Sequence, residues 1–237
     1  MKTFPAGMKQ FCFVWLLPAC IVLSFLPARA AQHGAPFERL FGHQAFPAGT
    51  QDFPLHIRKH WLRVIQAEQK DPCLQRDSSC LPPADAQSWL YLVRKAPSMN
   101  EMELLRAVNA FFNKFPSIPN LETYNAKDSW PTPRDFLNRR AGDGKAYALT
   151  KYFALRVLGM QDDRLRIVLA HLPERRTNHA MLAVATAKGV FILDNAVRPT
   201  DLILPQERFA SRCLPLVMFN GAGRWTFRQD MELPDGK

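Results

Sequence analysis

The chain has 237 residues, of which 47% are hydrophobic, so it contains enough apolar material for one compact domain and large-scale disorder is excluded. The formal net charge is +10, yet the arginines are scattered and no nucleic-acid-binding module is visible. Composition therefore gives no support for a nucleic-acid-binding protein.

The first thirty residues have the pattern of a secretory signal. Two lysines precede an apolar run at 11–25, and the Ala-Arg-Ala sequence at 28–30 supplies the small residues of a cleavage site. We expect residues 1–30 to be removed and the mature protein to be periplasmic or secreted. A retained anchor is the alternative, although Pro18 interrupts a run that is shorter than the ~20 residues a bilayer requires. A lipoprotein site at Cys20 is a weaker alternative.

Cleavage would leave a basic protein. Of 31 basic residues three would be lost, leaving 28 against 21 acidic residues and a formal charge of +7. Such an excess speeds encounters with anionic envelope polymers, lipid head groups or acidic proteins. We expect an envelope or surface protein segment as partner, no nucleic acid, and no integral membrane segment after cleavage.

Residues 31–52 are rich in Gly, Pro and Phe without periodicity and are expected to form an extended arm. Three helices are predicted after it from apolar residues at helical spacing. They run from about residue 57 to the Asp71-Pro72 stop, from 84 to 95, and from Asn100, which can cap a helix whose Glu103 completes a capping box, to Pro116.

Three cysteines remain after signal cleavage. Cys73 and Cys80 flank a short polar segment, and a disulfide closing so small a loop would contribute about 2.5 kcal/mol to stability. Two free thiols are the alternative. Cys213 lies in an apolar stretch and is interpreted as a core residue rather than a reactive thiol.

A loop at 117–131 separates these helices from two further predicted helix starts. Thr132 followed by Pro133 is a capping pattern for a short helix to about residue 140. Asp143 has the character of an N-cap for a helix that ends at Gly159. Gly144 is therefore expected in the first turn of that helix.

The period then changes to that of strands, which are predicted at 165–169, 180–186, 190–193, 214–219 and 225–227. Helices followed by an antiparallel sheet define an α+β fold. We assign residues 53–237 to a single domain, with a helical part at 53–160 and a sheet part at 161–230.

His179 opens one predicted strand and Asp194 closes the next, so a hairpin turning near residues 187–189 would bring them together. A histidine oriented by an acid is the usual base beside a nucleophile. The nucleophile would be best placed at a helix start, because the helix dipole and free N–H groups favour a thiolate. Alone, a histidine before an apolar strand is more often structural or solvent-exposed, and an Asp-Asn pair at a strand end is commonly turn chemistry.

Four segments resemble the bacterial transglutaminase-like cysteine peptidases, a group that includes the LapG-like periplasmic proteases that trim surface adhesins. They are Trp130–Pro133, Gly142–Tyr152, His179–Val184 and Ile192–Asn195. The resemblance extends from about residue 53 to 225. It implies a papain-like or transglutaminase-like fold, a thiol hydrolase activity, catalytic roles for His179 and Asp194, and a regulatory membrane receptor as a further partner.

The chain departs from this family where the helix begins. The family's Gly-Asp-Cys-Glu-Asp pattern places the nucleophilic cysteine at Gly144, the glutamate at Lys145 and the next acid at Ala146. Glycine cannot attack a carbonyl. The acids around the cysteine are associated with calcium in LapG-like members, and only Asp143 remains here, so we expect the calcium site to be lost and no cofactor to be bound.

Other nucleophiles are available, but none lies at the helix start: the hydroxyls of Ser129, Thr132 and Thr150, for which caps or surface positions account, and the thiol of Cys213. Three hypotheses follow. The first is a non-catalytic relative that binds an envelope protein. The second is an active hydrolase or acyl transferase that uses another nucleophile, or whose parent sequence had cysteine at 144. The third is an envelope scaffold.

Overall fold

The computed structural model of the protein describes residues 37–74, 81–125 and 128–228, which all belong to one compact unit, Gln32–Lys237. The predicted signal at 1–30 and Cys80 lie outside these residues, so signal cleavage and the Cys73–Cys80 disulfide stay predictions. Within the described ranges, no helix combines the length and the apolar character needed to cross a membrane.

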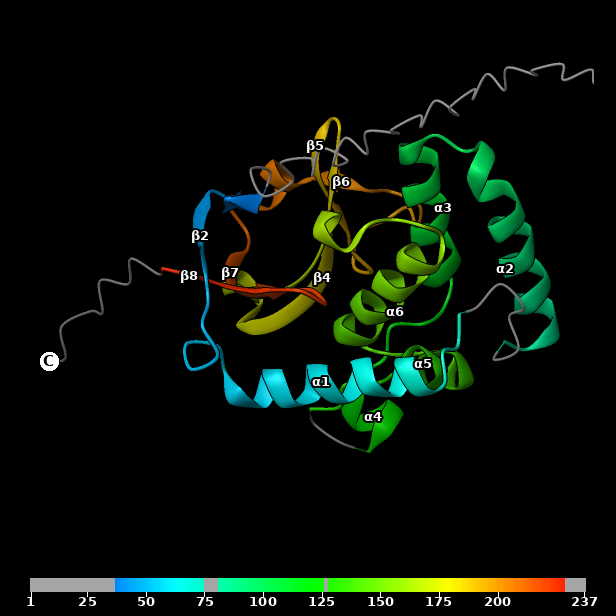
Figure 1. Cartoon of the computed structure of the whole chain (residues 1–237), viewed down its shortest axis with the longest axis horizontal. Coiled ribbons are helices and arrows are strands. Elements are labelled where there is room, and N and C mark those ends of the chain that lie inside the picture. Colours follow the sequence, from blue (N-terminus) through cyan, green and yellow to red (C-terminus); the bar gives the residue numbers. More distant parts are fainter. Residues whose placement is uncertain (1–36, 75–80, 126–127, 229–237) are drawn as a thin grey trace, which may run out of the picture. The chain divides into compact units, whose positions relative to one another are not determined.

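The helices precede most of the strands, as the predicted α+β order requires (Figure 1). The helices are α1 (Leu55–Lys70), α2 (Pro83–Lys95), α3 (Glu101–Asn113), α4 (Asn120–Tyr124), α5 (Pro133–Arg139) and α6 (Gly144–Val157), with 3-10 turns η2 (Ala96–Ser98), η3 (Asp162–Arg164), η4 (Pro173–Arg175) and η5 (Gln206–Phe209). The strands are β1 (Arg39–Leu40), β2 (His43–Pro47), β3 (Leu165–Leu172), β4 (Thr177–Thr186), β5 (Gly189–Leu193), β6 (Leu204–Pro205), β7 (Leu214–Phe219) and β8 (Arg224–Phe227).

The predicted helix starts are made by local hydrogen bonds. The Asn100 side chain accepts from the Glu103 N–H at 3.0 Å, and the Glu103 carboxylate accepts in return from the Asn100 N–H at 2.8 Å. Thr132 caps α5 in the same reciprocal way. Such bonds satisfy donors that the first helical turn leaves free, so a few adjacent residues fix where each helix begins.

The strands form one eight-stranded antiparallel sheet in the order β1-β2-β8-β7-β3-β4-β5-β6. Alternate residues of β4 face opposite sides of it: Ala180, Leu182 and Val184 join the helical core, and their neighbours join a second apolar cluster. Because β4 is buried on both faces, it reads as a nearly continuous apolar run. The second cluster contains Phe37, Phe41, Met181, Ala183, Met218 and Cys213.

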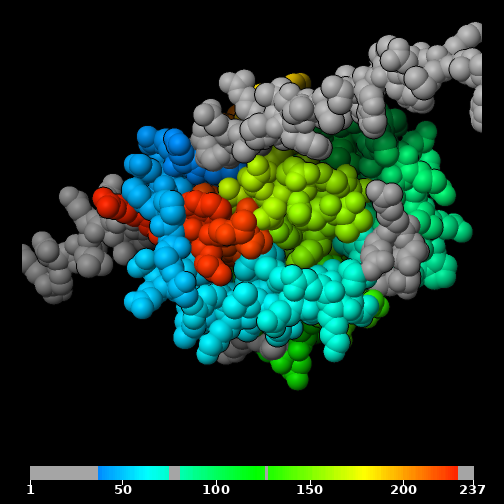
Figure 2. All heavy atoms as spheres, viewed as in Figure 1, coloured from blue at the N-terminus to red at the C-terminus, as the bar shows by residue number. Residues whose placement is uncertain are grey.

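Helix α6 lies in the middle of the helical layer, against β3 and β4, and α1 runs along its side (Figure 1). Figure 2 shows the surfaces of α1 and α6 next to each other on one face. The Trp61 ring from α1 packs edge-on against Tyr152 of α6 at 5.4 Å between centroids. The second half of α6 is thus held by a packed core.

Three features of the fold were not predicted. The extended arm contains β1 and β2, and β2 pairs with β8, so the sheet draws on residues before 53 as well as on 161–230. Helix α4 lies within the predicted loop at 117–131, and β6 follows β5. Strands β1 and β6 have only two residues each, too few for an alternating pattern, and β2 pairs with β8 at the far end of the domain, so no local pattern announces them.

Candidate active site

The first functional element is the start of α6. Asp143 is the N-cap, as predicted, and its Oδ1 accepts from the Ala146 N–H at 3.1 Å. Gly144 is the first residue of the helix. The free N–H groups and the dipole of this fourteen-residue helix favour negative charge beside Gly144.

The structure brings His179 and Asp194 together. The β4–β5 hairpin turns between Thr186 and Gly189, and at its other end His179 Nε2 lies 2.6 Å from Asp194 Oδ1. An ionised carboxylate only accepts hydrogen bonds, so Nε2 donates to Asp194, and in the neutral form of the imidazole the lone pair is on Nδ1. Burial by itself would raise the pKa of Asp194, but the hydrogen bond and charge of His179 hold it below its ordinary value.

Asp194 is braced from two directions. Its Oδ1 also accepts from the Ala196 N–H at 3.1 Å, and its backbone carbonyl accepts from Asn113 Nδ2 of α3 at 2.8 Å. Beneath it, the fully buried Lys151 donates to Asn109 Oδ1 at 2.7 Å. Burial lowers the pKa of Lys151 to about 7. The His179–Asp194 pair, called the dyad below, is therefore fixed by a polar network that does not include residue 144.

The imidazole occupies the space that a side chain at 144 would need. A Cβ atom built on Gly144 would lie 2.7 Å from His179 Nδ1, 2.8 Å from its Cε1 and 2.9 Å from the backbone oxygen of Ala180. Real Cβ atoms essentially never approach neighbours this closely. Position 144 thus faces the lone pair of a base oriented by an acid, and it has no nucleophile to offer.

Gly144 and His179 line a cleft of about 940 Å³, within the size range of ligand sites. Its wall combines apolar side chains with polar ones, the latter including Asn120, Asp128, Lys145, Arg175 and Asn195. Two carboxamide oxygens of this wall, Asn120 Oδ1 and Asn195 Oδ1, are buried and have no hydrogen-bond partner among the described residues. Buried acceptors usually have a partner, so these two are suited to a ligand that brings donors.

The alternative nucleophiles do not reach the helix start. Cys213 lines a small cavity of about 130 Å³ together with His179 and Asp194, but burial raises the pKa of its thiol to about 11, which disfavours the thiolate. Thr132 is the cap of α5, as expected. Thr150 is fully buried, so the surface or cap role expected for it is wrong.

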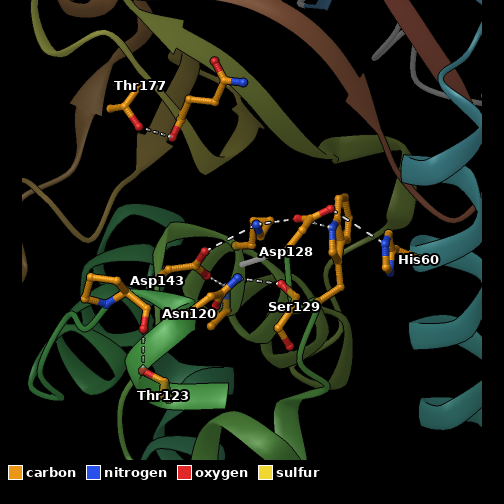
Figure 3. Close-up of polar contacts among 12 residues, drawn as sticks. His60, Asn120, Thr123, Asp128, Ser129, Asp143 and Thr177 are labelled. Atoms are coloured by element: carbon orange, nitrogen blue, oxygen red, sulfur yellow. Dashed lines mark hydrogen bonds and ion pairs between the residues drawn. The ribbon is translucent and has the colours of Figure 1, made fainter. Parts of the chain in front are cut away.

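The acidic residue that remains at the expected calcium position, Asp143, has a cation as neighbour. Lys145 Nζ lies 3.5 Å from Asp143 Oδ2 and 2.8 Å from Asp128 Oδ1, and Asp128 is in turn 3.7 Å from His60 (Figure 3). No group of three or more His, Cys, Asp or Glu side chains in the described ranges is arranged to hold a metal ion.

Sequence reasoning missed the polar network of α3 and α6 and the role of Asp128. Lys151 lies four residues after Tyr147, on the apolar stripe of α6, and a charged residue at such a position signals a buried partner. No local signal connects Asp128 with Lys145, because the loop and the helix meet only in the folded chain.

A buried helix whose start faces a histidine and an acid on an antiparallel sheet defines the class of transglutaminase-like thiol peptidases. Residues 69–205 match the family described as bacterial transglutaminase-like cysteine proteinase, BTLCP. The chain belongs to this family, and its fold is the α+β, transglutaminase-like fold that the sequence predicted. No curated protein matches the chain.

Three solved structures support the same fold. Legionella pneumophila LapG is 25% identical, with a TM-score of 0.54, over 65% of this chain and 83% of LapG. The EGTA-treated LapG is 24% identical over 67% and 86% of the two chains, with a TM-score of 0.55. The calcium-bound LapG is 23% identical over 73% and 91%, with a TM-score of 0.53.

Proposed function

We propose that this protein is an exported, non-catalytic member of its family that binds a segment of an envelope or surface protein in the cleft beside Gly144. The observation that carries the proposal is the glycine itself: its position faces His179 Nδ1, where a thiol would be activated, and a Cβ there would contact the ring at 2.7 Å. Without a side-chain nucleophile at 144, the oriented imidazole has no thiol to activate, which favours binding over cleavage.

The cleft has features suited to an extended polypeptide. Asn120 Nδ2 donates to the Ser129 carbonyl at 2.9 Å, so the amide orientation is set and its Oδ1 is left as an acceptor (Figure 3). Asn195 Nδ2 is 3.0 Å from Ser117 Oγ, and its Oδ1 is likewise unpaired within the described structure. A bound segment that displaces the atoms covering these oxygens would donate main-chain N–H groups to them, and the basic surface would speed capture of an acidic partner.

Export rests on the signal pattern at 1–30, which supports a periplasmic or secreted location. In that compartment the Cys73–Cys80 disulfide would form. A membrane receptor that regulates binding is part of the same proposal, by analogy with the family.

The test is incubation of the purified protein with envelope proteins, followed by chemical crosslinking and by sequencing of new termini. Ala196 is exposed and lines the cleft, so Ala196→Trp should fill the cleft without disturbing its backbone hydrogen bond to Asp194. Ala187→Trp, on the exposed turn at the other end of β4, is the matched control. We expect crosslinking by the wild type and the control, its loss in Ala196→Trp, and no new termini.

The roles of the dyad are separated by His179→Ala. Binding without catalysis predicts that this variant still crosslinks its partner. New termini that the pure wild type generates and His179→Ala does not would overturn the proposal in favour of an active hydrolase. Crosslinking that Ala196→Trp leaves unchanged would overturn the cleft as the binding site and favour the scaffold hypothesis.

A further inference from the structure

A lysine lies between two carboxylates at the mouth of the cleft. Lys145 Nζ is 2.8 Å from Asp128 Oδ1 and 3.5 Å from Asp143 Oδ2, and only 19% of the Lys145 side chain is exposed. Figure 3 shows Asp143 and Asp128 on either side of this contact. One carboxylate caps α6 and the other belongs to the segment before Trp130, so the ammonium joins two parts of the chain.

Asp128 also contacts α1, through His60. Trp130 Nε1 donates to Asp128 Oδ1 at 3.2 Å, His60 Nε2 lies 3.7 Å from Asp128 Oδ2, and the His60 and Trp130 rings stack at 5.6 Å with an interplanar angle of 4°. Partial burial alone would raise the pKa of Asp128, but the hydrogen bond from Lys145 and its charge hold the pKa below its ordinary value. Asp128 is therefore a charged junction of three segments.

These residues do not fit the calcium ion that the family resemblance implies. Calcium takes six to eight oxygen ligands, and a lysine ammonium between two carboxylates supplies none and repels a divalent cation. A lysine in the first turn of a helix is also opposed by the helix dipole, so Lys145 gains from the carboxylates on both sides.

We infer that the ammonium of Lys145 is a built-in replacement for a metal ion, joining Asp128 to Asp143 so that the mouth of the cleft keeps its form without calcium. This role of Lys145 affects the stability of the protein alone and requires no partner, so its test does not depend on the proposed binding function.

The experiment compares melting temperatures in calcium chloride and in EGTA. We expect the wild type to melt at the same temperature in both. Lys145→Met should melt about 2–4 °C lower in both, since a loss of about 1 kcal/mol shifts a domain of this size by that amount. Lys145→Glu should melt lower still in EGTA, because three carboxylates then face one another, and calcium should restore part of the loss.

Lys59→Met is the matched control, since Lys59 is exposed on the neighbouring α1, and it should melt with the wild type. A cycle of Lys145→Met and Asp128→Asn supplies a measurement that does not depend on the glutamate variant: the two losses should not add. Saturable stabilisation of the wild type by calcium, additive losses in the cycle, or a Lys145→Glu protein that calcium leaves unchanged would each overturn the inference.

Discussion

Replacing Gly144 by alanine tests whether the imidazole really lies against the helix start. The added Cβ would be 2.7 Å from His179 Nδ1 and 2.9 Å from the Ala180 carbonyl oxygen. Asp194 holds the ring from the other side, at 2.6 Å, so the ring cannot move away without stretching that bond. The carbonyl belongs to β4, which pairs with β3 at Ala180 itself and with β5 from Leu182 onward, so it cannot shift freely.

The magnitude follows from two opposing effects. Overpacking one carbon into a filled site costs about 1–3 kcal/mol. Alanine is preferred over glycine in a helix interior by up to about 1 kcal/mol, but Gly144 is the first helical residue and would gain only part of that. We therefore expect Gly144→Ala to destabilise the wild type by about 1–2 kcal/mol in urea unfolding.

The decisive comparison is the same substitution in a His179→Ala background. Removing the ring removes its two close contacts and leaves only the one to the Ala180 oxygen, so the loss caused by Gly144→Ala should fall by about 1 kcal/mol. Equal losses in the two backgrounds would show that the His179 ring does not fill this space and that Gly144 does not face it.

Three further predictions concern the network, a helix cap and an introduced thiol. The pKa of Lys151 falls from 10.5 to about 7 on folding, so the unfolded chain binds more protons than the folded one between these pH values. The free energy of unfolding should therefore rise with pH across that window, by up to about 1.4 kcal/mol per pH unit. The rise should be less steep in Lys151→Met. Asn100→Ala should lower the free energy of unfolding by about 1 kcal/mol, whereas exposed Asn138→Ala should not. In Gly144→Cys, iodoacetamide should alkylate residue 144 faster than in the same variant lacking His179, and equal rates would contradict an activating base.

Helix boundaries were predictable wherever a few neighbouring residues determine them. The capping box of Asn100 and Glu103 and the Asp143 cap involve side chains three residues from their partners, so the sequence displays the whole interaction. Helix α4 has no side-chain cap and only five residues, so no local signal distinguishes it from a loop. Helix α4 matters for the site because its first residue is Asn120, whose Oδ1 is an unpaired acceptor in the wall of the cleft.

The candidate site was predictable only in part, for a related reason. His179 and Asp194 are joined by one hairpin, and their meeting follows from strand pairing over fifteen residues. The contact of Asn113 with Asp194 spans 81 residues, and that of Lys145 with Asp128 joins a helix to a loop. Contacts of this kind depend on how α3 and α6 pack on the sheet, and no local pattern records them.

The dyad and the nucleophile position are supported by different parts of the molecule. Asp194 is held by Asn113 and by the Ala196 N–H, and neither bond requires a side chain at residue 144. Loss of a nucleophile would therefore leave the His179–Asp194 pair in place, since the pair also completes the hydrogen bonding of buried groups. A retained His179–Asp194 pair in this fold is consequently weak support for catalysis. The residue that is informative about catalysis is residue 144, which faces His179 Nδ1.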